Sequence, residues 1–194
     1  MSDPNVQRIN LPLLATKEDC TGRTYIVTGA NTGLGFEAAK HLVALGSKKV
    51  ILAVRNVTAG NEAKAKIDSA TNTTDVAEAW YLDLANYDSV KNFAKKAITE
   101  LDRIDGLIQN ASVASIAEEP LNGQDANISI NVVGTFLLAL HLLPKLSESA
   151  RKNNGQSRLT FVCSRAGFEV EKLWSMIKDD PFAGIRTKEV GPAK

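Results

Sequence analysis

Short apolar runs alternate with amphipathic stretches along most of this chain. A continuous run such as 50–54 is typical of a strand that is covered on both faces. Runs of this kind predict strands at 24–27, 50–54, 76–82, 104–108 and 158–162. Between them, apolar residues recur with a helical period, which predicts helices over 36–45, 57–70, 87–101 and 124–143. Strands that alternate with helices indicate an α/β fold, a parallel sheet with right-handed crossovers.

A glycine-rich stretch, TGANTGLG, follows the first expected strand and opens the first expected helix. Such a turn brings backbone N–H groups and the positive end of a helix dipole to an anion. We expect Gly29 to allow a sharp exit from the strand, Gly33 to let a pyrophosphate approach, and Gly35 to let the helix pack against the sheet. The alternative is a tight turn without a ligand, because this spacing differs from the G-x-G-x-x-G of other dinucleotide folds.

The residues that end the next three strands lie where such sheets bind their ligands. Arg55 ends the second strand, where a free ribose 2′-hydroxyl would favour Asp or Glu, so the arginine favours a 2′-phosphate and hence NADP. Asp83 ends the third strand and could accept a hydrogen bond from adenine. Asn110 ends the fourth, and the small Ala111 after it leaves room for a ribose. Alternatively, Arg55 lies in solvent at the sheet edge, Asp83 caps the next helix, and Asn110 forms a turn.

Two further polar residues belong to the same pattern. Asn131 lies inside the long expected helix. Asparagine has a poor helix propensity, so we expect it to point outward unless its side chain has a function at the site. Ser164 follows the fifth strand, and a serine in that place is otherwise an ordinary turn residue. Because five strand ends converge on one crevice, we expect these residues to form a single site.

Composition narrows the function classes. The chain has 194 residues, 44% of them hydrophobic, which suits one domain with a real core. Its net charge of +1 gives no field that would attract nucleic acid or an anionic membrane. Two cysteines, Cys20 and Cys163, argue against a disulfide scaffold or a cysteine metal site. Residues 1–19 lack a secretory pattern, and the apolar stretch 132–143 is too short to span a bilayer, so we expect a cytoplasmic protein.

In combination, these motifs resemble the short-chain dehydrogenase/reductase family. The resemblance rests on TGANTGLG, Asp83-Leu84, Asn110-Ala111, Asn131 in Asn-Val-Val-Gly and Ser164 in Ser-Arg-Ala-Gly, over residues 22–167. Segment 50–56 is most similar to the retinol-dehydrogenase-like, NADP-using branch, and the whole resembles fungal members, which often act in secondary metabolism. The resemblance implies a Rossmann-type, doubly wound parallel sheet in three α/β/α layers.

The resemblance also implies a role for each site residue. The pyrophosphate and its ribose would lie against Gly29, Asn31, Thr32, Gly33, Leu34 and Gly35. The other contacts to NADP would come from Arg55 (2′-phosphate), Asp83 and Leu84 (adenine), and Asn110 and Ala111 (adenosine ribose). Ser164 would hydrogen-bond the oxygen of a carbonyl or alcohol substrate during hydride transfer, and Asn131 would hold a helix kink and a water of the proton relay. A carbonyl that gains negative charge needs such a fixed donor.

The chain departs from the family at its catalytic pair, a Tyr with a Lys four residues later. No Tyr follows Tyr87, and the one Y-x-x-x-K, from Tyr87 to Lys91, precedes the fourth strand and is expected to start an outer helix. Ser112 also replaces a family glycine. We therefore expect a C-terminally truncated member: an arm over 1–20, an NADP-binding domain over 21–167 and the start of a substrate-region insertion over 168–194.

Truncation would leave the fifth strand as an open edge, and the long helix would expose Phe136, Leu137, Leu140 and Leu143. Two functions then stay open: an NADP-dependent oxidoreductase, or an inactive NADP-binding module or fragment that lacks the acid/base pair. A methyltransferase is disfavoured, since it would want an acidic residue where Arg55 stands. The sequence does not decide whether the chain forms a homo-oligomer.

Overall fold

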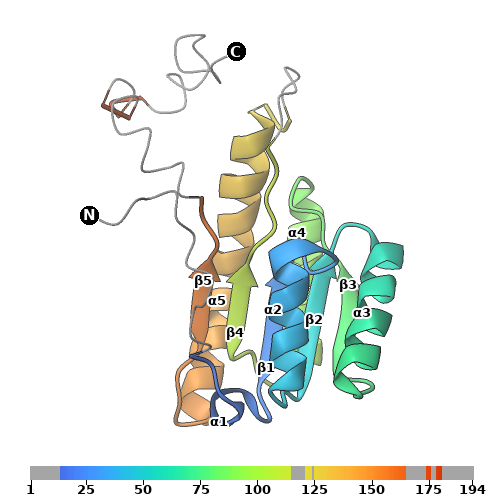
Figure 1. The fold of residues 1–194 in the computed structure, drawn as a ribbon. Coiled ribbons are helices and arrows are strands. Elements are labelled where there is room, and N and C mark those ends of the chain that lie inside the picture. Colours follow the sequence, from blue (N-terminus) through green and yellow to red (C-terminus); the bar gives the residue numbers. More distant parts are fainter. Residues whose placement is uncertain (1–13, 115–120, 124, 165–173, 176–177, 181–194) are drawn as a thin grey trace, which may run out of the picture.

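The fold is a parallel five-stranded sheet with helices on both faces (Figure 1), as the sequence predicted. The computed structural model describes residues 14–114, 121–123, 125–164, 174–175 and 178–180. The strands are β1 (Thr24–Thr28), β2 (Lys49–Val54), β3 (Ala77–Tyr81), β4 (Gly106–Gln109) and β5 (Arg158–Phe161). The helices are α1 (Lys17–Cys20), α2 (Gly33–Ala44), α3 (Val57–Thr71), α4 (Tyr87–Glu100), the π-helical η1 (Ile128–Gly134) and α5 (Thr135–Lys152).

The strand order is β3-β2-β1-β4-β5, so the chain changes direction across the sheet between β1 and β4. This is the switch point at which open α/β sheets bind ligands outside the carboxyl ends of the strands. The pairing of β1 with β2 is continuous from Thr24↔Lys49 to Thr28↔Ala53, which brings the ends of these two strands level. The glycine turn therefore leaves the sheet beside Arg55.

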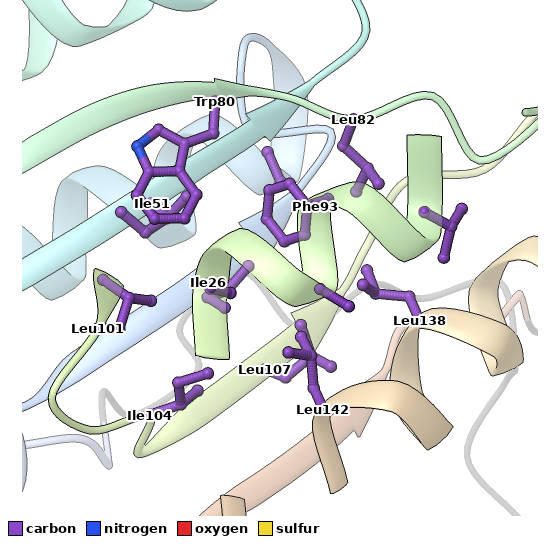
Figure 2. Close-up of a cluster of buried hydrophobic side chains, with 14 of the residues drawn as sticks. Ile26, Ile51, Trp80, Leu82, Phe93, Leu101, Ile104, Leu107, Leu138 and Leu142 are labelled. Atoms are coloured by element: carbon purple, nitrogen blue, oxygen red, sulfur yellow. The ribbon is translucent and has the colours of Figure 1, made fainter. Parts of the chain in front are cut away.

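Two cores lie on the two faces of the sheet. In β1, Ile26 faces the core beneath α4 and α5, whereas its neighbour Val27 faces the core beneath α2 and α3, as the period of two in a strand requires. Figure 2 shows the first core, where the rings of Trp80 and Phe93 meet edge to face with their centroids 5.8 Å apart. Because both faces are covered, residues 50–54 are all buried.

The long helix extends further than predicted. We expected it to end at residue 143, but η1 and α5 continue through Pro144 to Lys152. Pro144 removes a hydrogen bond to the carbonyl of Leu140, which lies on the solvent side and is 65% exposed, so water can replace that bond. Leu142 and Leu146 on the opposite side are buried in the core and hold the helix in place.

The expectation of an extended arm over 1–20 is wrong at its end. Residues Lys17–Cys20 form a short helix that begins with a capping box, in which Thr16 and Asp19 satisfy each other's backbone N–H groups. Four residues are too few to show a helical period, although the Thr-x-x-Asp spacing was a usable signal. Residues 1–13 lie outside the described part of the chain.

In the described part of the chain, one helix, Ile128–Lys152, is long and apolar enough to cross a membrane by length and composition. Buried core helices pass the same test, and this helix packs on the sheet through Leu138 and Leu142, which are fully buried. We therefore do not take it as a membrane span.

Candidate active site

A cavity of about 170 Å³ opens where β1, β2, β3 and β4 end. Its lining brings together six residues predicted from the sequence: Gly29, Asn31, Arg55, Asp83, Leu84 and Ala111. The other lining residues are Ala53, Leu82, Ser112, Val113 and Ile130. Four strand ends and one helix thus converge on one crevice at the switch point.

The glycine turn needs glycines for two different reasons. Gly29 has a φ of +66°, a conformation that side chains disfavour, and this confirms its part in the sharp exit from β1. Gly35 is at an ordinary φ, but a Cβ there would lie 2.5 Å from the carbonyl oxygen of Gly29 and from Nδ2 of Asn110. Gly35 therefore lets α2 start directly against the turn and the end of β4. Apart from the neighbouring residues of its own turn and helix, no described residue comes within 4 Å of a Cβ built on Gly33, so the backbone there is open to an approaching group.

The N-terminus of α2 has no side-chain cap. Thr32 is the N-cap residue, but its side chain accepts no capping hydrogen bond, and the first turn carries no acidic residue. The first backbone bond of the helix runs from the N–H of Phe36 to the carbonyl of Thr32, at 3.2 Å. The N–H groups before it belong to Gly33, Leu34 and Gly35, and an uncapped helix start of this kind suits a bound phosphate.

Thr28, which the sequence analysis did not single out, joins the ends of β1 and β4. Its Oγ1 accepts hydrogen bonds from the N–H groups of Asn110 and Ala111, both at 2.9 Å. In return, Nδ2 of Asn110 donates to the carbonyls of Thr28 at 3.1 Å and Gly29 at 3.4 Å. The side chain of Asn110 is thus engaged by the turn and does not line the cavity, so its predicted contact with a ribose stays a prediction.

Arg55 and Asp83 face the cavity from neighbouring strands. Arg55 is exposed and, within the described residues, has no ion pair. Asp83 is half-buried, and its Oδ1 accepts from the N–H of Ala85 at 2.9 Å. The alternative that Asp83 caps the next helix is wrong, because Asn86 is the N-cap of α4. The second carboxylate oxygen of Asp83 remains a candidate acceptor for a ligand.

A second cavity, of about 620 Å³, lies next to the first and contains both predicted catalytic residues, Asn131 and Ser164. The two cavities share Ala111, Ser112 and Val113 as lining residues. Ser164 is exposed at the end of β5. The sequence therefore located both side chains at this edge, whereas the chemical role of each stays a prediction.

Asn131 sits in the π-helical η1, and its amide clamps the loop after β4. Its Oδ1 accepts from the N–H of Val113 at 2.9 Å, and its Nδ2 donates to the carbonyl of Val113 at 2.8 Å. The side chain of Asn131 therefore has a structural role, which explains why a residue of poor helix propensity lies inside this helix. A water of a proton relay at Asn131 is not tested by this geometry.

Gln109 is a buried polar residue that sequence reasoning missed. It is 2% exposed, its Nε2 donates to the carbonyl of Thr135 at 3.0 Å, and its Oε1 has no hydrogen-bond partner among the described residues. Gln109 lines the second cavity and ties β4 to the start of α5. The available signal was a glutamine at the end of an apolar run.

The Tyr87-to-Lys91 motif starts α4, as expected. Lys91 pairs with Asp88 at 3.1 Å, and neither Tyr87 nor Lys91 lines either of the two cavities. Ser112 lines both cavities with an exposed side chain, so the substitution for glycine adds atoms at the site. No group of three or more His, Cys, Asp or Glu side chains in the described ranges could hold a metal ion.

A family model described as short chain dehydrogenase matches residues 23–176. This chain belongs to the short-chain dehydrogenase family. Its relatives include the short chain dehydrogenase/reductase dmxR8 of Cryptosporiopsis, 46% identical over 145 residues, which cover 74% of this chain and 45% of dmxR8. The short chain dehydrogenase FGM9 of Gibberella zeae is 39% identical over 183 residues, which cover 93% of this chain and 52% of FGM9. This short-chain dehydrogenase thus resembles fungal members, as predicted, and spans about half the length of these curated relatives.

Solved short-chain dehydrogenases share the fold. A Pseudomonas aeruginosa RhlG complex with NADP superposes with a TM-score of 0.64 at 27% identity, covering 76% of this chain and 56% of that chain. An Escherichia coli short chain dehydrogenase complexed with NADPH gives a TM-score of 0.66 at 26% identity, covering 80% of this chain and 64% of that one. This chain thus has the fold of solved short-chain dehydrogenases.

Proposed function

We propose that this short-chain dehydrogenase uses NADP(H) and that it transfers a hydride between the cofactor and a carbonyl or alcohol substrate. The observation that carries the choice of cofactor is Arg55. It directly follows β2 beside the glycine turn, lines the first cavity and has no ion pair among the described residues. A guanidinium in that position is a bidentate partner for a 2′-phosphate. The solved relatives that carry NADP or NADPH support the same choice.

The shape of the edge fits such a dinucleotide. The open backbone at Gly33 and the uncapped start of α2 leave room and free N–H groups for a pyrophosphate, with Asn31, Thr32 and Leu34 around it. Asp83 and Leu84 would then hold the adenine, and Ala111 would lie against the ribose. The bound cofactor would supply or accept the hydride. The hydroxyl of Ser164 would donate to the substrate oxygen, where negative charge develops.

Calorimetric titration of the 194-residue chain with 2′,5′-ADP and with 5′-ADP tests the proposal. We expect 2′,5′-ADP to bind at least roughly tenfold more tightly, since a hydrogen-bonded ion pair contributes about 1.5–3 kcal/mol. The R55Q variant should lose this preference. The matched control R151Q removes an exposed arginine from the last turn of α5 and should retain it. Equal affinity for the two nucleotides in the unchanged chain would refute the proposed choice of NADP.

An inactive NADP-binding module is the second candidate function, because no tyrosine follows Tyr87 in this chain. A missing general acid typically costs 10²–10⁴-fold in rate. Binding of NADPH without oxidation of the cofactor in the presence of a simple aldehyde or quinone would favour this candidate for the chain itself. The cytoplasmic location and a role in secondary metabolism stay predictions.

A further inference from the structure

The wall of the first cavity at Leu84 is supported from behind by the π-helical segment. Gly134, the last residue of η1, is buried, and a Cβ built on it would lie 2.1 Å from the carbonyl oxygen of Leu84 and 3.0 Å from its carbonyl carbon. The helix backbone therefore lies directly against the Leu84 peptide group. Leu84 is 6% exposed and is one of the residues that line the first cavity. Any side chain at position 134 must push this peptide group toward the cavity or push the helix away.

A second contact holds the next peptide group of the same wall. Nδ2 of Asn122 donates to the carbonyl oxygen of Ala85 at 2.8 Å. Asn122 has a φ of +54°, a left-handed conformation that asparagine tolerates better than most residues, and this conformation accompanies the hydrogen bond. The N–H of Ala85 is held in turn by the side chain of Asp83. The steric contact at Leu84 and the two hydrogen bonds of Ala85 thus help to hold this segment, together with the hydrogen bond from the N–H of Asp83 to Oγ of Ser89 at 3.0 Å.

The π-helical segment contributes to the cavity itself one turn earlier. Ile130 lines the first cavity, whereas Gly134 lies behind Leu84 and does not line it. The same segment therefore supplies part of the lining and also contacts the peptide group of Leu84. A small shift of η1 changes both.

We propose that Gly134 and Asn122 are positioning residues for the adenine end of the cofactor, acting through the Leu84-Ala85 wall. This inference rests on the proposed function, since it assumes that NADP(H) occupies the first cavity. Neither residue touches the ligand. Gly134 keeps the Leu84 carbonyl back from the cavity, and Asn122 prevents the wall from moving along the sheet edge.

The test compares affinity for 2′,5′-ADP with thermal stability in three variants, at a temperature where each is folded. G134A should bind about tenfold more weakly, because overpacking displaces backbone. N122G retains the positive φ, removes one exposed hydrogen bond and should bind about threefold more weakly. The control is G106A at the amino end of β4, where a Cβ would lie 2.6 Å from Cδ1 of Tyr25. G106A should lower the melting temperature and leave the affinity for 2′,5′-ADP unchanged.

The outcomes separate the two proposals. Failure of the unchanged chain to bind 2′,5′-ADP refutes the proposed function and this inference with it. Binding by the unchanged chain, together with unchanged affinity in N122G and in a folded G134A, overturns this inference alone. Equal weakening in all three variants also overturns it, because a general loss of packing would then explain the effect. If G134A does not fold, the affinities of N122G and G106A for 2′,5′-ADP are compared instead. Weaker binding by N122G than by G106A supports the inference, and equal binding by the two overturns it.

Discussion

At the scale of single residues, the hydroxyl of Thr28 holds the two strand ends that flank the switch point. It accepts hydrogen bonds from two backbone N–H groups, those of Asn110 and Ala111. Thr28 is 0% exposed, and loss of its Oγ1 would leave both donors without this partner. The geometry of the glycine turn thus depends on the side chain of Thr28, the last residue of β1 before the turn.

We predict that T28V lowers the free energy of unfolding by about 2 kcal/mol, because two partly buried N–H groups lose their acceptor. T24V is the matched control: Thr24 lies in the same strand, is 4% exposed, and its hydroxyl makes no hydrogen bond among the described residues. Urea unfolding measures both. An equal decrease in the free energy of unfolding of the two variants would show that the hydrogen bonds of the Thr28 hydroxyl contribute no additional stability.

Prediction from sequence succeeded for charged residues whose side chains are known to bind particular ligand groups. Arg55 and Asp83 end strands and were placed correctly at the cavity. It failed for Thr28 and Gln109, whose partners are backbone groups of segments far away in the chain. Asn110 was placed at the correct edge, but its engagement with the glycine turn depends on the distance between two strands, which no local pattern contains.

At the scale of elements, β2 and β3 are joined at an outer edge by a charged pair. Nζ of Lys49 lies 3.1 Å from Oε2 of Glu78, and Nε1 of Trp80 donates to Oε1 of the same carboxylate at 2.7 Å. Partial burial raises the pKa of Glu78, but the hydrogen bonds from Trp80 and Lys49 outweigh it, so the pKa lies below its ordinary value. The carboxylate therefore stabilises the folded state while it is ionised.

The sign of the pH effect follows from this depression. Stability from Glu78 is fully present above the ordinary glutamate pKa and is lost as the pH falls through the lower pKa of the folded state. We predict that the free energy of unfolding of E78Q falls less steeply between about pH 5 and pH 3 than that of the unchanged chain. Unfolding in urea across this range measures the slope. A steeper fall in E78Q would contradict the assignment.

Continuous apolar runs located all five strands, and the period of 3.6 located the helices from α2 to α5. These patterns did not predict η1, because a π-helical segment has neither of them, and its formation depends on the contacts of Asn131 and Gly134 with loops from other strands. The predicted helix also ended at residue 143, just before Pro144, because burial of Leu142 and Leu146 in the core, which holds the helix beyond the proline, depends on the fold.

At the scale of the whole molecule, one side of α5 and the edge strand β5 expose apolar residues. Exposed fractions are 49% for Phe136, 65% for Leu140 and 45% for Leu143. This confirms the expected apolar stripe except at Leu137, which is partly buried and packs against the core. β5 pairs only with β4 in the described sheet. The exposed apolar surface therefore lies on α5 and β5, the last helix and the last strand of the described fold.

We predict that this surface limits the solubility of the 194-residue chain. L140K/L143K should stay monodisperse in light scattering at a higher concentration than the unchanged chain, because it interrupts the apolar stripe without entering the core. The control is K152Q, which alters an exposed charge on the same helix away from the stripe. Unchanged aggregation in L140K/L143K would show that the stripe is not the cause.

The central claim is that this short-chain dehydrogenase binds NADP(H) at the carboxyl edge of its sheet, and calorimetric titration with NADPH and NADH tests it most directly. The account predicts that NADPH binds with a dissociation constant at least roughly tenfold lower than NADH, because only NADPH presents a 2′-phosphate to Arg55. Tighter binding of NADH, equal binding of the two, or no binding of either would contradict it.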